Sequence, residues 1–279
     1  MNDFAVCTIC PHACKLKEGQ VGLCKACRCV DGSVVSDSYG CITSLALDPI
    51  EKKPLMQFMP GSMILSVGSF GCNLNCPFCQ NASIAQAGRQ DVAWQGITPE
   101  QLIDEAIRLH DRGNVGIAYT YNEPLVNYEF VRDCAQLAHE HGLVNVLVSN
   151  GMANAEIIED LSGLLDAVNI DLKGFNQEFY SFVGGDLDSV KRTIEILVNC
   201  PTCHVEVTTL IVPGKNDTDE EIVALAQWLA SLDSEIPYHV SRFFPCYKMA
   251  HGNPTPVRRV YHLADVARQY LSHVYTGNC

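Results

Sequence analysis

The stretch Gly71-Cys72-Asn73-Leu74-Asn75-Cys76-Pro77-Phe78-Cys79-Gln80-Asn81 places three cysteines in a C-x3-C-x2-C spacing. Cysteine thiolates are the usual ligands of iron–sulfur clusters, and a complete [4Fe–4S] shell normally takes four of them. No fourth cysteine follows within the next fifty residues. We therefore expect Cys72, Cys76 and Cys79 to hold a cluster and to leave one iron open to a ligand from outside the protein.

A structural zinc loop is the alternative interpretation of the same cysteines. Zinc sites usually pair two C-x2-4-C arms and are closed by four ligands. The uneven triplet, with the aromatic Phe78 directly before its last cysteine, favours the cluster.

With this triplet following a predicted strand at residues 64–70, the sequence resembles the radical S-adenosylmethionine (SAM) superfamily. The resemblance implies that the open iron binds the amino and carboxylate groups of SAM. It also implies that an electron from the cluster cleaves SAM into methionine and a 5′-deoxyadenosyl radical, and that an electron donor of the flavodoxin or ferredoxin type serves as a partner.

Composition excludes several classes of protein. Forty-seven per cent of the 279 residues are apolar, enough for a substantial core, and no apolar run approaches the ~18 residues that span a bilayer. The net charge of −13 with scattered basic residues weighs against a nucleic-acid substrate. Fifteen cysteines without a recognisable signal peptide indicate metal-bound thiolates in a reducing cytoplasm. We expect a cytoplasmic protein with no membrane or nucleic-acid partner.

The chain divides into two regions that differ in composition and in apolar periodicity. Residues 1–60 are rich in cysteine and glycine and poor in helical periodicity, which predicts a small metal-binding module and a linker that ends in the bridge at residues 48–54. Residues 61–279 alternate apolar strands with amphipathic helices. Strands are expected at residues 64–70, 115–120, 143–149, 167–172, 205–212, 238–243 and 274–276. Helices are expected at residues 99–112, 125–141, 155–165, 187–198, from Thr218 onward, and 257–271.

Two of these helices carry capping-box signatures, Thr98 with Gln101 and Thr218 with Glu221. Repeated β–α–β units imply parallel strands with right-handed crossovers. The sequence therefore predicts an α/β fold, a partial TIM-like (β/α)6 barrel. Ligands of such folds gather at the carboxyl ends of the strands.

Polar residues follow several predicted strands, and their chemistry matches SAM. The carboxylate of Glu123 can accept from the amino group, and the ammonium of Lys173 can neutralise the carboxylate. Asn150, which lies between Ser149 and a glycine, can bond ribose hydroxyls. Two plainer interpretations stay open: Glu123 can be a charge at a helix N-terminus, and Asp171 can form a simple ion pair with Lys173.

The resemblance sharpens to the pyruvate formate-lyase-activating enzyme branch, onto whose motifs residues 122–124, 150–151, 171–173 and 212–214 map. It implies cofactor-binding roles for Phe78 and Val212 as well. Two positions depart from that branch. Tyr121 and Asn122 replace a Gly-Gly pair, and Val148 replaces an acidic residue. The chain also resembles AmmeMemoRadiSam-type radical SAM proteins over nearly its whole length, in the cysteine-rich N-terminus, the 48–55 bridge, and residues 60–62, 79–81, 170–175, 241–243 and 277–278.

Several further residues are candidates for binding. One closed four-thiolate site is expected in the N-terminal module, holding either zinc or a second cluster, and the family pattern favours Cys7, Cys10, Cys14 and Cys24. Cys27 and Cys29 leave this choice of ligands open. Arg242, near the end of its strand, is a candidate contact for a substrate carboxylate. Cys246 follows the same strand and is expected on the active face.

Three functions compete at this point. The first is an enzyme that generates the 5′-deoxyadenosyl radical and abstracts hydrogen from a protein or small-molecule substrate. The second is an activase proper, which takes a glycine Cα hydrogen from a glycyl radical enzyme. The third is a non-catalytic zinc or iron–sulfur protein, which would not need Glu123, Asn150 and Lys173 at successive strand ends.

Overall fold

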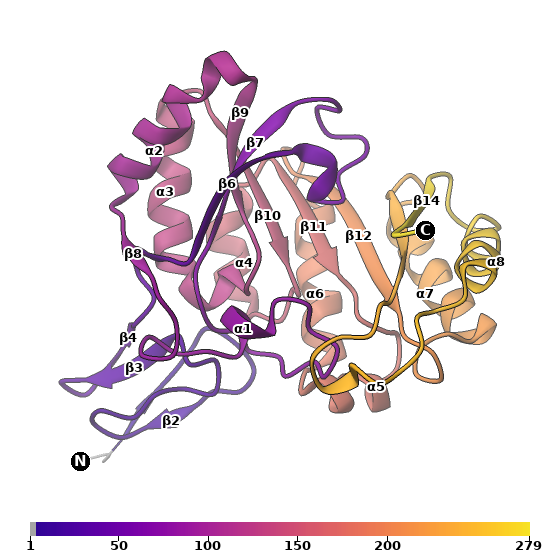
Figure 1. Cartoon of the computed structure of the whole chain (residues 1–279), viewed down its shortest axis with the longest axis horizontal. Helices are drawn as coiled ribbons and strands as arrows, with labels where there is room; N and C mark the ends of the chain where they lie inside the picture. The colour runs from indigo at the N-terminus through magenta and orange to yellow at the C-terminus, as the bar shows by residue number, and fades with distance from the viewer. Residues whose placement is uncertain (1–3) are drawn as a thin grey trace.

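One sheet of eight strands forms the centre of the fold in the computed structural model, which describes residues 4–279 (Figure 1). Its strands are β6 (Ser44–Pro49), β7 (Met63–Gly68), β9 (Asn114–Tyr119), β10 (Val144–Ser149), β11 (Ala167–Asp171), β12 (His204–Ile211), β13 (Tyr238–Arg242) and β14 (Val274–Gly277). They lie in the order β14-β13-β12-β11-β10-β9-β7-β6, so β6 and β14 form two open edges. The seven strands from β7 to β14 pair in parallel, and β6 pairs antiparallel with β7. The predicted partial TIM-like α/β fold is confirmed.

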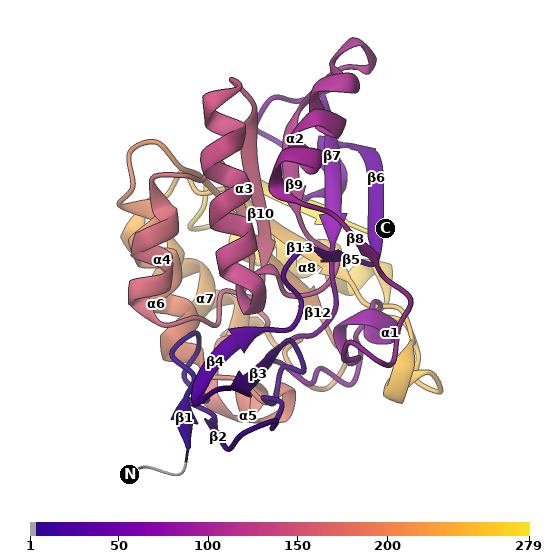
Figure 2. The same cartoon turned by 90° about the vertical axis from the view of Figure 1, so that its left-hand side faces the viewer.

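Helices cover one face of this sheet, as Figure 2 shows for α3, α4 and α6. The main helices are α2 (Pro99–Arg108), α3 (Tyr128–Glu140), α4 (Ala155–Ser162), α6 (Leu187–Val198), α7 (Asp219–Leu232) and α8 (Val257–Ala267). Shorter ones are α1 (Ala82–Ala85), α5 (Gln177–Val183), and the 3-10 turns η1 (Ile50–Lys52), η2 (His110–Arg112), η3 (Pro124–Asn127) and η4 (Tyr247–Met249). Each main helix buries an apolar face against the sheet, which forms the largest core of the protein. No helix within residues 4–279 is both long and apolar enough to cross a bilayer.

The helix starts test the two predicted capping boxes. Thr98 accepts from the backbone N–H of Gln101, whose side chain returns the bond, so the first box is confirmed. Thr218 accepts from the N–H of Glu221, but the Glu221 carboxylate accepts from the backbone N–H of Phe175 and the side chain of Asn176 instead. The second box is therefore wrong, because that carboxylate binds the start of α5, a helix that the sequence patterns did not predict.

The inside of the partial barrel is closed where its strands begin. Ile50 and Leu55 pack there against Ile64, Ala118 and neighbouring strand residues in a separate apolar cluster. The segment from η1 to Leu55 thus fills the barrel at the amino ends of its strands, and ligands of such folds gather at the opposite end.

The region assigned to the N-terminal module contains one strand of the main sheet that the sequence patterns missed. β6, at residues 44–49, hydrogen-bonds along the edge of the main sheet. Two short hairpins precede it, β1 (Ala5–Val6) with β2 (Lys15–Leu16) and β3 (Cys27–Val30) with β4 (Ser33–Ser36). β5 (Cys41–Ile42) pairs with β8 (Gln95–Gly96). By its hydrogen bonding β6 belongs to the sheet, while the domain division at residue 60 stays a prediction.

The two hairpins lie below the carboxyl ends of β9 and β10 in Figure 1. They contact the cysteine loop directly: the carbonyl of Cys24 accepts from the backbone N–H of Cys72 at 3.1 Å, and His12 Nε2 lies 2.8 Å from the carbonyl oxygen of Asn73. The carbonyls of Thr8 and Ile9 accept from the side chain and backbone of Asn154. The cysteine-rich segment is therefore docked at the end of the barrel where ligands gather.

Candidate active site

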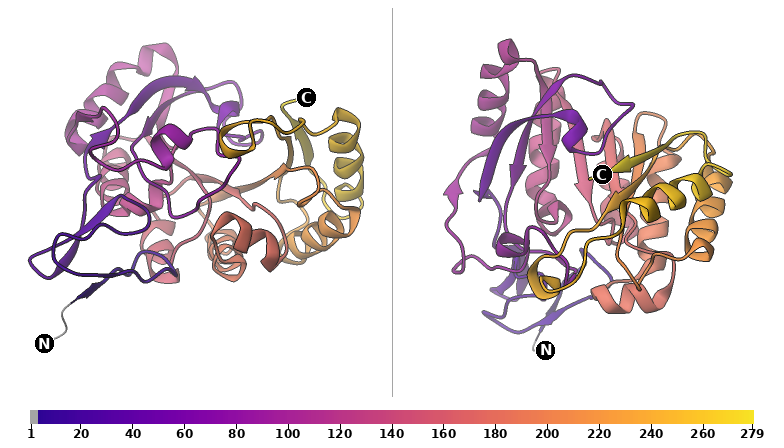
Figure 3. Two further views of the ribbon diagram at one scale, coloured as in Figure 1. Left: turned by 60° about the horizontal axis from the view of Figure 1, so that its bottom comes forward. Right: turned by 45° about the vertical axis from the view of Figure 1, so that its right-hand side comes forward.

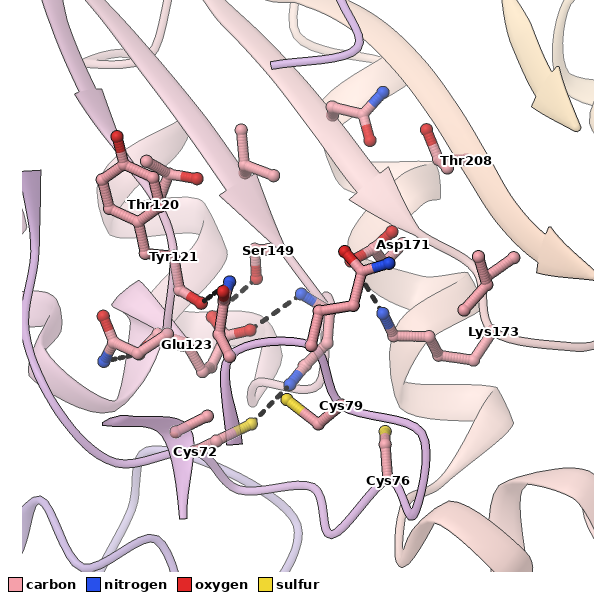
Figure 4. Close-up of a pocket in the computed structure, with 18 of the residues that line it drawn as sticks. Cys72, Cys76, Cys79, Thr120, Tyr121, Glu123, Ser149, Asp171, Lys173 and Thr208 are labelled. Carbon is pink, nitrogen blue, oxygen red and sulfur yellow. Dashed lines mark hydrogen bonds and ion pairs between the residues drawn. The ribbon is translucent and has the colours of Figure 1, made fainter. Parts of the chain in front are cut away.

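A cavity of about 330 Å³ lies at the carboxyl ends of the parallel strands. Figure 4 shows the three cysteines of the triplet along one side of it and the ends of β9, β10 and β11 along the other. Its lining includes the predicted strand-end candidates other than Val212 and Arg242: Glu123, Ser149, Asn150, Asp171 and Lys173. Residues that are far apart in the sequence, such as Cys72 and Lys173, thus meet at one site, as expected for a barrel.

The cysteine loop is held in place by backbone hydrogen bonds on both sides. Asn75 donates to the carbonyl of Val183 at the end of α5, at 2.8 Å. Gly71 enters the loop with φ of +89°, and a Cβ there would lie 2.5 Å from the carbonyl oxygen of Cys24. Only glycine fits this close approach and left-handed backbone. The loop geometry is therefore set before any cofactor binds.

Burial raises the pKa of the triplet thiols. The pKa of Cys76 rises to about 11, although the nearby Lys173 ammonium opposes the increase, and that of Cys72 rises well above its usual value. Metal binding to thiols requires that they lose their protons, so it would release protons here. The thiolates would need a positively charged inorganic partner to become stable in this surrounding.

No group of three or more His, Cys, Asp or Glu side chains within residues 4–279 is arranged to surround a single metal ion. A four-iron cluster makes a different demand, because its cysteine ligands bind separate irons and need not converge on one point. Three thiols along the wall of one cavity form a donor set that fits such a cluster.

The side chain of Phe78 packs the cysteine loop against α5. Its ring is buried, lines the cavity and packs against Phe179 and Phe182 of α5, with ring centroids 6.1 Å and 6.3 Å away. The aromatic residue before the last cysteine therefore anchors the loop on α5.

Glu123 occupies the centre of a hydrogen-bond network at the ends of β9 and β10. Its Oε1 accepts from the backbone N–H of Leu125 and the hydroxyl of Ser149, and its Oε2 accepts from the backbone N–H of Asn150. Complete burial raises the pKa of Glu123 to about 7, while these three donors oppose the increase. The residue caps η3 as the plainer interpretation expected, and it also faces the cavity.

The side chain of Asn150 is fully engaged inside the protein. Its Nδ2 donates to Asn73 Oδ1 at 2.9 Å and to Cys72 Sγ at 3.6 Å, and its Oδ1 accepts from the backbone N–H of Met152. The ribose-binding role expected for Asn150 would use the second lone pair of Oδ1, since both Nδ2 hydrogens already have partners. In this structure the residue positions the cysteine loop.

Asp171 and Lys173 form an ion pair of 2.7 Å at the end of β11. Burial lowers the pKa of Lys173, but Asp171 and the Cys76 thiol more than compensate, so its net pKa is raised and the ammonium stays charged. The plain ion pair considered from the sequence is thus present, and it lies on the cavity wall where a ligand carboxylate can reach it.

Val212 and Arg242 are not brought to the cavity lining. Val212 is buried, and its backbone N–H donates to Asn216 Oδ1. Arg242 donates to the carbonyl of Thr255 and lies over the ring of Phe244. The alternation along β13 explains the difference, because Ser241, one residue earlier, lines the cavity and Arg242 points to the other side.

The sequence reasoning missed polar residues inside the barrel, among them Asn169 and Thr208, which both line the cavity. A signal was available. Buried parallel strands normally read as nearly continuous apolar runs, so Asn169 in β11 and Thr208 in β12 interrupt the pattern at inward positions. Lys53, from the bridge between β6 and β7, also lines the cavity, and no periodicity pointed to it.

Cys246 lies on the active face as expected. The loop after β13 runs back toward the cysteine loop (Figure 3), where the Cys246 thiol donates to the carbonyl of Phe78 at 3.1 Å and Lys248 contacts Asn75. This loop covers the outer side of the triplet.

The N-terminal thiols gather around a second, much smaller cavity. Its lining includes Cys7, Cys10, Cys14, Cys24 and Cys27. The Sγ atoms of Cys24 and Cys27 are 3.5 Å apart. Cys29 lies apart from them and contacts Glu18. The structure thus places the four predicted ligands, and Cys27 with them, along one small cavity, while no three of these thiols among the described residues converge on a single metal position.

Comparison with known proteins gives a consistent picture. The family model described as "Radical SAM superfamily" matches residues 66–229. An uncharacterised protein of Methanocaldococcus jannaschii is 39% identical over 280 residues, which cover 98% of this chain and 80% of that protein. The pyruvate formate-lyase 1-activating enzyme of Escherichia coli (strain K12) is 26% identical over 61% of this chain and 71% of its own length.

Solved structures share the fold. The crystal structure of a radical SAM methyltransferase from Sphaerobacter thermophilus matches 79% of this chain and 67% of that chain, with a TM-score of 0.58 and 17% identity. At this identity the likeness concerns the arrangement of strands and helices alone.

Proposed function

Because the chain belongs to the radical SAM superfamily, whose enzymes use a [4Fe–4S] cluster and SAM, we propose that it abstracts hydrogen from a substrate with a 5′-deoxyadenosyl radical. When bound, the cluster supplies the electron that divides SAM into methionine and this radical, and a reductant of the flavodoxin or ferredoxin type replaces that electron. The radical takes one hydrogen atom from the substrate and becomes 5′-deoxyadenosine. The single observation that supports this proposal is the meeting of the cysteine triplet with Glu123 and the Asp171–Lys173 pair at one cavity.

Different residues of the chain are proposed to bind the cluster and SAM. Cys72, Cys76 and Cys79 are the proposed cluster ligands. The Lys173 ammonium, held by Asp171, can bind the carboxylate of SAM. The Glu123 carboxylate faces the same cavity and can accept from the amino group, while Ser149 and the backbone of Asn150 hold it in position.

Two bonds connect this carboxylate with the cysteine loop. Asn150 donates through its backbone to Glu123 and through its side chain to Cys72. Burial of Glu123, Asn150 and Phe78 excludes water from this side of the site. A reactive carbon radical needs such exclusion, because side reactions compete with transfer to the substrate.

Reductive cleavage of SAM tests this proposal directly. Anaerobically purified protein, reconstituted with iron and sulfide and reduced with dithionite, should form 5′-deoxyadenosine and methionine in equal amounts. The triple variant Cys72→Ala/Cys76→Ala/Cys79→Ala should form neither. Wild-type protein with a full complement of cluster iron that binds SAM and never cleaves it would contradict the proposal.

The origin of the abstracted hydrogen can be found with deuterium. A metabolite pool from cells grown in deuterated medium, divided by ultrafiltration into small molecules and proteins, is added to the reduced enzyme. Mass spectrometry of the 5′-deoxyadenosine then shows which fraction transfers a deuterium atom.

An activase for a glycyl radical enzyme is the second candidate, since the pyruvate formate-lyase 1-activating enzyme of Escherichia coli is 26% identical to this chain over the aligned residues. In the deuterium experiment this function would place the donor in the protein fraction. A small-molecule donor would place it in the filtrate.

We also propose a structural metal in the N-terminal segment, held by four of its thiols. The family pattern favours Cys7, Cys10, Cys14 and Cys24. The 3.5 Å separation of Cys24 and Cys27 supports Cys27 in place of Cys14, since Cys7-x2-Cys10 and Cys24-x2-Cys27 then form the two short arms that are typical of zinc sites. Zinc and a second cluster both remain candidates for this site.

A further inference from the structure

Two buried polar atoms of residues that line the cavity have no hydrogen-bond partner among residues 4–279. They are the hydroxyl of Thr208, a residue on β12 that is 6% exposed, and the amide oxygen of Asn169, a residue on β11 that is 0% exposed. Figure 4 shows Thr208 on the cavity wall beyond Asp171. An unpartnered buried polar group destabilises the folded protein, so a ligand that supplies the partner would recover this loss.

Asn169 is held firmly in its orientation. Its Nδ2 donates to the carbonyl of Pro54 at 2.8 Å, so its Oδ1 cannot exchange places with the nitrogen without breaking that bond. An acceptor is therefore presented to the cavity, and a ligand that meets it must carry an N–H or O–H group.

A buried ammonium group lies on the same cavity. Lys53 is 2% exposed, its Nζ is 2.9 Å from Asp48 Oδ2, and it lies 4.8 Å from the centroid of the Tyr121 ring. Asp48 also accepts from the Tyr121 hydroxyl at 2.7 Å and from Lys52 at 3.1 Å. One carboxylate thus serves two ammonium groups, of which only that of Lys53 is buried, since the Lys52 side chain is 65% exposed.

The buried Lys53 ammonium is neutralised by Asp48, as Lys173 is neutralised by Asp171 at the end of β11. Lys53 makes a single hydrogen bond among residues 4–279, to Asp48, although an ammonium group has three donors. Its other N–H donors favour an acceptor in the cavity, such as the oxygen of an anionic group, because a buried donor without a partner is expensive.

From this juxtaposition we propose that Lys53, Thr208 and Asn169 form a substrate subsite for a small molecule with an oxyanion group, a carboxylate or a phosphate. The Lys53 ammonium and the Thr208 hydroxyl donate to the oxyanion. The Asn169 amide oxygen accepts from an N–H or O–H elsewhere on the same molecule. The inference rests on the proposed function, because it assigns the substrate of that reaction.

The subsite can be tested without the natural substrate. Inorganic phosphate and malonate are titrated separately into the anaerobically reconstituted full chain by calorimetry, at constant ionic strength, with and without saturating SAM. We expect one of the two anions to bind with a Kd below about 10 mM. Phosphate binding indicates a phosphorylated substrate, and malonate binding indicates a carboxylate.

Three variants and two matched controls locate the binding. Lys53→Met should weaken anion binding about tenfold or more, and Thr208→Val about threefold or more. Lys191→Met removes an ammonium group that lies over Phe175 and Trp228 outside this cavity, and Thr193→Val removes another buried unpartnered hydroxyl. Both controls should bind the anion like the wild type. Lys173→Met, measured without SAM, shows how much of the anion binding belongs to Lys173, and loss of all binding in this variant would overturn the subsite.

Thermal stability is a second readout for Thr208→Val, because the loss of a hydroxyl with a purely structural role would lower it. The wild-type hydroxyl is unpartnered in the free protein, so its replacement by a methyl group should leave thermal stability unchanged or increased. Weaker anion binding at undiminished stability supports the subsite. A destabilised Thr208→Val protein, binding of neither anion to the wild type, or equal binding to Lys53→Met would overturn it.

The proposed radical chemistry fails in a different way. If the wild type does not bind or cleave SAM, the titration without SAM still reports on the subsite. If SAM is cleaved normally and no anion binds, the reaction stands and the substrate assignment is wrong.

Discussion

The side-chain amide of Asn150 donates a hydrogen bond of 3.6 Å to the sulfur of Cys72. This bond joins the end of β10 to a loop that lies 78 residues earlier in the chain. Since the backbone N–H of Asn150 also donates to Glu123, one residue couples the proposed cluster ligands to the proposed SAM contact. Asn150→Ala keeps this backbone N–H and removes the side-chain bonds to Cys72 and Asn73, so it should lower the iron content of the cluster while the support of Glu123 stays in place, whereas the loss of a residue that contacts ribose alone would lower SAM affinity without loss of iron.

The cysteine triplet can be tested against a neighbouring thiol. The triple variant Cys72→Ala/Cys76→Ala/Cys79→Ala should lose the iron, sulfide and visible absorption of the proposed cluster, because no other thiolates replace all three ligands. Cys246→Ala is the matched control, since this thiol lies beside the loop and contacts Phe78 through a single hydrogen bond. Iron content measured by mass spectrometry should stay at the wild-type level in the control. Equal iron in the triple variant would show that the cluster is bound elsewhere.

Lys173→Met should weaken SAM binding about tenfold or more, a loss near 1.4 kcal/mol, because it removes the ammonium group that lies near Cys76 and Cys79 while keeping the length of the side chain. The cluster should remain intact. Lys215→Met is the control, since Lys215 lies over Phe182 and outside the cavity lining. Equilibrium dialysis with labelled SAM measures the difference, and equal affinities in both variants would remove Lys173 from the proposed site.

A buried carboxylate near the amino ends of the barrel strands predicts that stability depends on pH. Glu206 is buried at the start of β12, where it accepts from His204, His239 and the backbone N–H groups of Met56 and Gln57. Burial raises the pKa of this carboxyl, but the hydrogen bonds outweigh burial and lower it to about 2. A lowered pKa contributes stability that is present above the unfolded value near 4.5 and is lost as pH falls toward 2.

Glu206→Gln should accordingly cost about 3 kcal/mol of the free energy of unfolding at pH 7, from a shift of about 2.5 pKa units. The difference between variant and wild type should shrink by about half at pH 3. Urea unfolding of the metal-free protein at the two pH values measures it. Glu235→Gln, at an exposed carboxylate, should show little of this change, and a difference that stays constant with pH would refute the assignment to Glu206.

The proposed metal of the N-terminal segment predicts a defined ligand set. Cys10→Ser and Cys27→Ser should each lose one equivalent of zinc, or the iron of one cluster, and unfold the hairpins, because a thiolate-bound structural metal contributes about 10 kcal/mol or more. Cys134→Ser, at a buried thiol within α3, is the control and should keep the metal. Zinc and iron are counted together on all variants.

Cys14→Ser decides between the two sets of ligands. Retention of the metal favours Cys27 as the fourth ligand, and its loss favours the set that the family pattern suggests. Wild-type protein with iron for one cluster only and no zinc would show that the segment folds without a metal.

The sequence by itself determined the seven parallel strands and the six main helices, the cysteine triplet and the strand-end residues around it. Local rules suffice for these features. Apolar periodicity marks the elements, a Thr98 cap starts a helix, and side chains after parallel strands must meet at one end of the sheet. Glu123, Asp171 and Lys173 were predicted in this way, and the structure places all three on the cavity.

Only the tertiary structure decided which partners these side chains hydrogen-bond. Glu221 fits a capping box in the sequence, yet its carboxylate binds Phe175 and Asn176, because a second helix start lies within its reach. Lys53 enters the cavity from an irregular bridge that has no period to follow. Whether a buried polar atom such as the Thr208 hydroxyl finds a partner depends on neighbours from distant strands, and spacing along one strand cannot specify them.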